Sequence, residues 1–258
     1  CPTGINSDNG EVLKDAVKAD YTVTFHLPKI GLLVGSGAVY SGEVIVEDIN
    51  IPYGLEASIK TSVITKNDVR RFIPKRPING NKGTFGKVFI FAGCENMPGA
   101  CVIASKAAYR TGAGLVYSCS VKSVCRVVRN HLPEAVTKVL SDRDGFLFGE
   151  SSMEEDLKNA DAVVVGPGLG TADGVFDFVK NILRRAAVPV IIDADGLNAV
   201  SKDLNILKDV KYKCIITPHL GEMSRLTGKS VSEIKNNIVE CARGFSKKHG
   251  VIVVLKDF

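Results

Sequence analysis

Four short segments of the chain carry residue types that could bind a phosphorylated ligand. They are "AGCENMPGA" (92–100), "GPGLG" (166–170), "DADGLN" (193–198) and "TPHLGE" (217–222). Each segment follows an apolar run of the kind that forms a strand buried on both faces. Ligands of parallel α/β sheets bind at the carboxyl ends of the strands, so the sequence predicts that these segments line one site.

The two glycine-containing segments suit an anion because they leave backbone N–H groups open. Gly93 permits a tight turn, Pro98 fits the first turn of a helix, and Ala100 leaves room for a ligand near the helix start. Gly168 lies at the centre of a stiff loop whose amides could form an anion-binding nest. The alternative for both segments is an ordinary turn in which glycine serves packing.

The two polar segments offer carboxylates and an imidazole. Asp193 and Asp195, with Asn198 following, could hold Mg²⁺ through water or accept a ribose hydroxyl, and the alternative is that an Asp caps the next helix. His219 could hydrogen-bond a substrate amide or phosphate, and Glu222 lies in the next helical turn. A structural histidine is the alternative there.

Strands and helices alternate from residue 86 onward. Helices are predicted over 98–114, 123–132, 174–186 and 230–250, the last opening with a capping box formed by Ser230 and Glu233. This alternation predicts a mostly parallel sheet covered by helices, an α/β fold. Residues 1–60 contain strand signals at 21–27 and 42–52 without a long helix between them, which is not a self-sufficient fold. A short helix and a basic, proline-containing linker follow.

Composition narrows the classes of partner. The net charge of +5 is scattered and aromatic residues make up only 7%, so we expect no nucleic-acid partner, and we interpret "RRFIPKRP" (70–77) as a solvated linker. No apolar run reaches the roughly 18 residues of a membrane helix, and a cytoplasmic location is expected. The seven cysteines form no CxxC pair. They are therefore predicted to be buried thiols rather than a zinc site, with Cys94 placed where a helix start could lower its pKa.

The segments together resemble the ADP- or ATP-dependent NAD(P)H-hydrate dehydratase family. "KGTFGKVFIFAGCENMPGA", "GPGLG", "DADGLN", "TPHLGE" and "VVLKD" occur in the order typical of that family, and "CPTGINSDNGEV" resembles the end of an NAD(P)H-hydrate epimerase domain. The resemblance implies the C-terminal part of a Rossmann-like epimerase domain (1–60), a linker (61–82), and a dehydratase domain truncated at its C-terminus (83–258). The dehydratase part would have a three-layer ribokinase-like fold.

The resemblance also implies an activity, the repair of hydrated NADH and NADPH. The epimerase interconverts the two hydrate epimers. The dehydratase phosphorylates the S form with ADP, or with ATP in some relatives, using Mg²⁺, and loss of phosphate restores the ring. Ala100, Gly168 and His219 match hydrate-binding positions of the family. Lys256 matches the start of its nucleotide-binding segment, and Thr3 matches a potassium-binding position of the epimerase.

The catalytic aspartates of both activities are expected outside these 258 residues. We therefore expect no turnover of hydrated NADH by this polypeptide alone, which an assay with ADP tests. The fused order suggests an ADP user, and relatives commonly form homo-oligomers. The alternatives are a ribokinase-like kinase of a small vitamin-precursor alcohol and a non-catalytic nucleotide-binding protein. A Rossmann dehydrogenase is disfavoured because the glycine fingerprint is absent.

Overall fold

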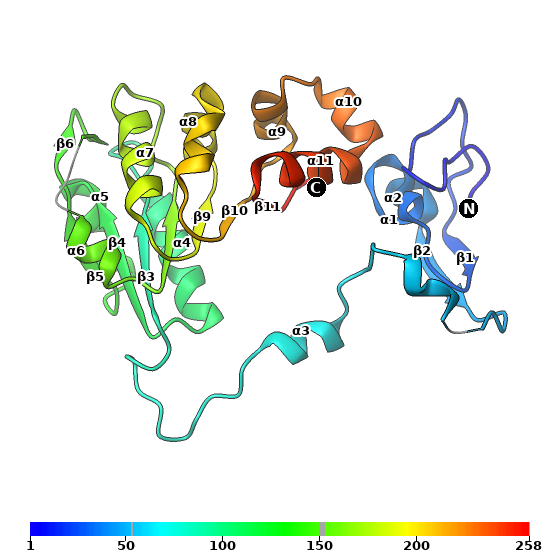
Figure 1. Cartoon of the computed structure of the whole chain (residues 1–258), viewed down its shortest axis with the longest axis horizontal. Helices are drawn as coiled ribbons and strands as arrows, with labels where there is room; N and C mark the ends of the chain where they lie inside the picture. The colour runs from blue at the N-terminus through cyan, green and yellow to red at the C-terminus, as the bar shows by residue number, and fades with distance from the viewer. Residues whose placement is uncertain (53, 150–152, 258) are drawn as a thin grey trace. The chain divides into compact units, whose positions relative to one another are not determined.

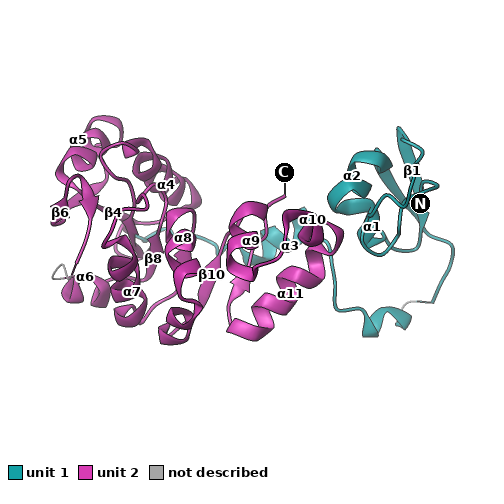
Figure 2. Ribbon diagram, turned by 90° about the horizontal axis from the view of Figure 1, so that it is seen from above, with its two compact units in different colours: residues 1–80 teal, residues 81–258 magenta. Residues whose placement is uncertain are grey.

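The chain folds as two compact units, residues 1–80 and 81–258 (Figures 1 and 2). The computed structural model describes residues 1–52, 54–149 and 153–257, so the predicted domain end at residue 258 lies outside the described residues.

Unit 2 (81–258) is built on a seven-stranded sheet with the order β11-β10-β9-β8-β3-β4-β5, and every strand pair in it is parallel. Phe89, Ile90 and Phe91 of the central strand β3 are buried, as the apolar run predicts. The α/β prediction of a mostly parallel sheet is therefore confirmed. The strands are β3 (Lys87–Phe91), β4 (Leu115–Ser120), β5 (Val136–Val139), β8 (Ala162–Val165), β9 (Val190–Ile192), β10 (Cys214–Ile216) and β11 (Ile252–Val253).

The helices of unit 2 lie in the connections between these strands. The chain runs outward from β3 to β5 in one direction and from β8 to β11 in the other, so right-handed crossovers place the two groups of helices on opposite faces. The change of direction between β3 and β8 is the switch point at which such sheets bind ligands. The helices are α4 (Pro98–Thr111), α5 (Lys122–His131), α6 (Glu154–Lys158), α7 (Val175–Arg185), α8 (Asp195–Lys202), η2 (Leu204–Asp209), α9 (Leu220–Thr227), α10 (Val231–Asn236) and α11 (Ile238–His249).

Several features of unit 2 differ from the sequence prediction, and one of them is the edge strand β5, which was not predicted. The predicted helix 230–250 starts at its capping box but breaks at Asn237 into α10 and α11. A short antiparallel hairpin, β6 (Asp142–Arg143) and β7 (Phe146–Leu147), was not predicted. Its loop residues Asp144 and Gly145 have φ values of 53° and 78°, the left-handed conformations of a two-residue Asp-Gly hairpin turn. The dipeptide was therefore a usable signal.

Unit 1 (1–80) contains one small parallel sheet. Thr22 and Thr24 of its first strand are buried, and the Thr22 hydroxyl donates to the Ser41 carbonyl at 2.6 Å. Only short helices connect the two strands, as predicted. The elements are β1 (Tyr21–Phe25), α1 (Ile30–Leu33), α2 (Gly35–Ser41), β2 (Glu43–Glu47), η1 (Leu55–Ser58) and α3 (Lys66–Phe72). Helix α3 has no buried residue.

Six of the seven cysteines are buried, and Cys1 is exposed, contrary to the prediction that all would be buried. Burial raises the pKa of Cys101 and of Cys214 to about 12. Cys94 is fully buried, so its thiol does not face solvent at the helix start.

Within the described residues, no helix combines the length and the apolar character needed to cross a membrane.

Candidate functional site

The glycine loops after β3 and β8 pack directly against each other. The Gly93 amide donates to the Pro167 carbonyl at 2.8 Å, and the Gly166 amide donates to the Phe91 carbonyl at 3.1 Å. Gly168 has a φ of 64°, and a Cβ built on it would lie 2.6 Å from the Cβ of Ala100. Glycine is therefore required at 168 both by backbone conformation and by the close approach of α4.

Helix α4 begins at this contact. Pro98 occupies its first turn as predicted, and Met97 at the N-cap supplies no side-chain cap. A Cβ built on Gly99 would meet open space. At the start of this fourteen-residue helix, Pro98 has no N–H and the Ala100 amide donates to the Met97 carbonyl at 3.4 Å. Among the described residues, the Gly99 amide is therefore the one left open at the switch point of the sheet, where an anion is favoured.

The loop after β8 is tied to the loop after β9 through Asp195. The Gly170 amide donates to Asp195 Oδ2 at 2.8 Å, and Asn198 Nδ2 donates to Asp195 Oδ1 at 3.0 Å. Both carboxylate oxygens are therefore used inside the protein. The N-cap of α8 is Ala194, so the capping role considered for Asp195 is not observed, and the side chain instead fixes the glycine loop.

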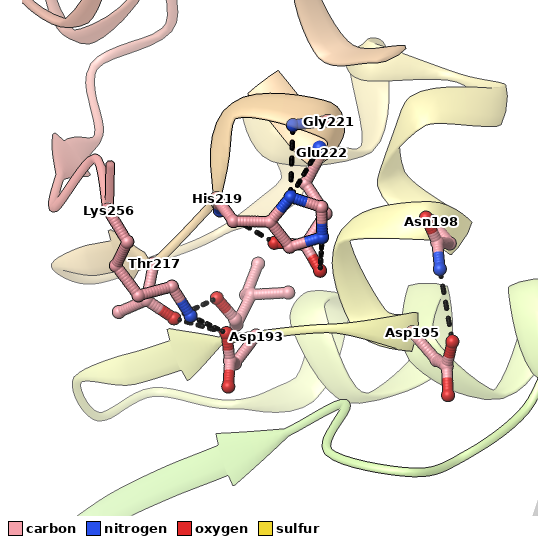
Figure 3. Close-up of polar contacts among 9 residues, drawn as sticks. Asp193, Asp195, Asn198, Thr217, His219, Gly221, Glu222 and Lys256 are labelled. Atoms are coloured by element: carbon pink, nitrogen blue, oxygen red, sulfur yellow. Dashed lines mark hydrogen bonds and ion pairs between the residues drawn. The ribbon is translucent and has the colours of Figure 1, made fainter. Parts of the chain in front are cut away.

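The Asp193 side chain connects the segments that follow three strands, β9, β10 and β11. Its Oδ1 accepts hydrogen bonds from Thr217 Oγ1 at 2.8 Å and from Lys256 Nζ at 2.9 Å, as Figure 3 shows. The next residue, Ala194, has a φ of 49°, a left-handed conformation that costs a non-glycine residue energy and is frequent at functional sites. The Asp193–Lys256 pair is partly exposed and brings one cation to the ligand edge of the sheet.

His219 is the N-cap of α9. Its Nδ1 accepts from the amides of Gly221 at 2.9 Å and Glu222 at 3.4 Å, while its own amide donates to Glu222 Oε2 at 2.9 Å (Figure 3). The structural alternative for this histidine is thus realised. The side chain is nevertheless 55% exposed, so the ring can also contact a ligand.

The predicted site residues fall into contacting groups. Ala100 contacts the position of Gly168, and Asn198 bonds to Asp195. Asp193 bonds to Lys256, which forms an isolated parallel bridge with His219. Thr3 belongs to unit 1, where it is exposed and its carbonyl accepts the amide of Val17 at 3.0 Å.

Sequence reasoning did not list Thr217 or Gly221 as functional residues. Thr217 adjoins Pro218 and His219 at the end of β10, and a hydroxyl at a strand end was the available signal. Gly221 had no such signal, because its importance depends on the position of the His219 ring.

A divalent ion would find few open protein ligands here. Among the described residues, no group of three or more His, Cys, Asp or Glu side chains is arranged to hold a metal. Each oxygen of Asp195 already accepts one hydrogen bond, and Asp193 has only Oδ2 without a protein partner. This fits Mg²⁺ that arrives with nucleotide phosphates and keeps several waters, and it does not fit a protein-only metal cage.

Fold and site together define an α/β protein with a parallel sheet, whose ligand edge joins glycine loops, a helix start, a lysine and a capped histidine. A family model described as NAD(P)H-hydrate dehydratase matches residues 88–257, and the chain belongs to this family. A second model, the YjeF-related protein N-terminus, matches residues 1–31.

Curated relatives extend the likeness over almost the whole chain. Proteins named bifunctional NAD(P)H-hydrate repair enzyme are 37% identical over 99% of the chain in Thermofilum pendens, 36% in Dictyoglomus turgidum and 30% in Escherichia coli. The chain spans about half the length of these relatives: 49%, 51% and 47%.

Solved structures share the fold of unit 2. An ADP/ATP-dependent NAD(P)H-hydrate dehydratase from Bacillus subtilis, co-crystallised with ATP and Mg²⁺, is 30% identical with a TM-score of 0.58. The match covers 74% of this chain and 65% of the Bacillus subtilis chain. A ribokinase-like protein from Enterococcus faecalis is 22% identical, with a TM-score of 0.64, and the match covers 75% of this chain and 65% of that protein. At this identity the likeness shows the fold alone.

Proposed function

We propose that unit 2 binds the S form of hydrated NADH or NADPH across the ends of β3, β8, β9 and β10. In the protein that carries it, the site serves ADP- or ATP-dependent dehydration of that hydrate. The observation that supports this most directly is the contact between Ala100 and Gly168. It brings the start of α4, with the Gly99 amide, beside the Gly168 amide at the switch point, where a phosphate oxygen of a dinucleotide can be received.

The remaining side chains suit the other demands of phosphoryl transfer. Transfer from ADP or ATP to the hydrate hydroxyl needs positive charge near the phosphates, and Lys256 supplies it at the end of β11. Mg²⁺, when bound with the nucleotide, neutralises further phosphate charge. Asp193 holds the Lys256 ammonium in place, and His219 offers a hydrogen bond to the substrate. Once the hydroxyl has been phosphorylated, the bond between the ring carbon and that oxygen breaks, phosphate leaves, a proton is lost from the neighbouring ring carbon, and the nicotinamide ring regains its double bond.

Unit 1 is proposed to belong to an NAD(P)H-hydrate epimerase domain. The support is the match of residues 1–31 to the YjeF-related family. Thr3 would then contribute an uncharged oxygen to a potassium ion, for which its exposed position leaves access. The fused order of the two parts makes ADP the proposed donor, and a homo-oligomer is the proposed assembly because members of the resembled family commonly assemble.

The test measures binding of hydrated NADPH to the 258-residue chain by calorimetry, with ordinary NADPH and ADP titrated in parallel. Ala100→Leu places a larger side chain over the start of α4, and we expect at least about tenfold weaker binding of the hydrate because the ligand is excluded from the loop. Ala107→Leu is the matched control, since Ala107 is an exposed residue of the same helix.

The melting temperatures of the two variants, measured beside their affinities, separate local blockage of the ligand from damage to the fold. Equal affinity of Ala100→Leu and the unchanged chain would remove this site from the proposal. Tighter binding of a small alcohol of the vitamin-precursor type than of the hydrate would favour the kinase alternative instead.

A further inference from the structure

The first turn of α9 surrounds the His219 ring on both of its nitrogens. Nδ1 faces two hydrogen-bond donors, the amides of Gly221 and Glu222. Nε2 faces an acceptor, Glu222 Oε1, at 3.3 Å. A ring nitrogen that accepts a hydrogen bond carries no proton, and one that faces a carboxylate oxygen is favoured in its protonated form.

Both contacts select the same form of the ring. From them we infer that Gly221 and Glu222 are positioning residues that hold His219 in one neutral tautomer, with the proton on Nε2. This inference deepens the proposed function and rests on it only for the identity of the ligand. His219 then acts toward the hydrated dinucleotide as a neutral hydrogen-bond donor to a ligand oxygen.

Glycine at 221 is part of this arrangement. A Cβ built on Gly221 would lie 2.9 Å from Cε1 and 3.2 Å from Nδ1 of His219, closer than real side chains pack. The φ of Gly221 is not in the left-handed region, so backbone conformation does not demand glycine there. The missing side chain instead makes room for the ring over the helix start.

Glu222 contacts both the backbone and the ring of His219. It is buried, with 5% of its surface exposed, and its Oε2 accepts the His219 amide while Oε1 lies beside Nε2. A buried carboxylate needs such partners. The contact between Nε2 and Glu222 Oε1 at 3.3 Å is electrostatic and is not a hydrogen bond, so among the described residues the Nε2 N–H has no acceptor and is available to a ligand that reaches the half-exposed ring.

A doubly protonated His219 would be incompatible with this cap. The imidazolium has no lone pair on Nδ1, so the amides of Gly221 and Glu222 would lose their acceptor. General-base catalysis by Nδ1 is excluded for the same reason, because that lone pair is already used.

The first experiment reads the tautomer directly. Long-range ¹H–¹⁵N spectra of the ¹⁵N-labelled chain, assigned with His219→Asn, should show His219 with a bare Nδ1 and a protonated Nε2. A reversed tautomer, or an averaged mixture of the two, would overturn the inference, whether or not the chain binds any ligand.

The second experiment compares binding with stability. Gly221→Ala pushes the ring away from the helix start, and we expect a mixed tautomer and about tenfold weaker binding of hydrated NADPH, the loss expected for one hydrogen bond. Gly244→Ala, at a helical glycine whose Cβ would meet open space, is the matched control and should bind normally.

The variant His219→Asn separates the capping role of the side chain from the role of the ring in ligand binding. Asparagine is among the best N-cap residues, so the melting temperature should stay close to that of the unchanged chain, while hydrate binding falls as in Gly221→Ala. Normal binding by His219→Asn would show that the ring only caps α9 and would refute the donor role. Absence of hydrate binding by the unchanged chain, with the single tautomer present, would instead count against the proposed function.

Discussion

Units 1 and 2 both contain parallel strands, yet they bury them very differently. In unit 2 the central strand β3 has its last three residues buried, and Phe91 packs edge-on against Phe178 with ring centroids 6.0 Å apart. In unit 1 the alternate residues of β1, namely Tyr21, Val23 and Phe25, are 66%, 51% and 56% exposed. Parallel sheets are normally covered on both faces, so the same strand type has a full core in one unit and an uncovered face in the other.

This difference shows that strand signals alone do not measure stability. Burial of apolar surface stabilises a fold in proportion to the area removed from water, and the large cluster of buried apolar residues lies entirely in unit 2. Local signals are equal in the two units, as their capping boxes show: Thr65 with Asp68 in unit 1, and Ser230 with Glu233 in unit 2. The contrast predicts different responses to matched changes.

Thiol chemistry should give the largest contrast. At pH 8, Cys1 of unit 1 should react with iodoacetamide, whereas Cys101 and Cys214 should be at least about a thousandfold slower because burial lowers both access and thiolate content. Peptide mass spectrometry over time checks this. Comparable labelling of Cys101 in the native chain would contradict the packing of unit 2, and labelling in urea provides the positive control.

Matched phenylalanine truncations should give the next contrast. Phe178→Ala removes a fully buried ring and should lower the free energy of unfolding of unit 2 by about 3–5 kcal/mol. Phe25→Ala in β1, whose ring is 56% exposed, should change stability by about 0.5 kcal/mol or less. Urea denaturation followed by circular dichroism measures both, and similar losses in the two variants would count against the difference in burial.

The capping boxes should give the smallest contrast. Ser230→Ala should destabilise unit 2 by about 1 kcal/mol, because α10 buries Ile234 in the core. Thr65→Ala should leave the unfolding of unit 2 unchanged, because α3 buries no residue. The same urea curves measure this, and an equal effect of both variants would mean that the two helices are coupled to unfolding alike.

The capping box of Ser230 and Glu233 should also make the stability of unit 2 depend on pH. The hydrogen bond from the Ser230 hydroxyl, followed by that from its amide, lowers the pKa of Glu233 below its usual 4.5. A lowered pKa gives stability that is complete above pH 4.5 and is lost as the pH falls through the folded-state value. Carboxyl ¹³C titration should therefore show the pKa of Glu233 rising in Ser230→Ala, and an unchanged value would contradict the capping box.

Much of the fold could be predicted because its signals are local. Pro98 at a helix start and Ser230 with Glu233 three residues later act through neighbouring backbone groups, and the structure has both helix starts where these residues predict them. The break at Asn237 was not predicted from the helical pattern, because the apolar residues on both sides keep helical spacing through the weak helix formers Asn236 and Asn237. Ile234 and Ile238 lie on its two sides, and both are buried. The hairpin β6–β7 had its Asp-Gly signal, but its strands have only two residues each, too few for a pattern.

In the site, too, some features could be predicted from local sequence and others depended on the tertiary structure. Residue types and their places at strand ends were determined by the sequence itself, because glycines, aspartates and His219 follow apolar runs directly. Their partners were decided by the tertiary structure, since the order of strands in the sheet places Asp193 beside Lys256, 63 residues away, and Gly170 beside Asp195. Local rules carry no information about that order, which depends on how the helices and strands pack. The close fit of the His219 ring over Gly221 depends on the same packing.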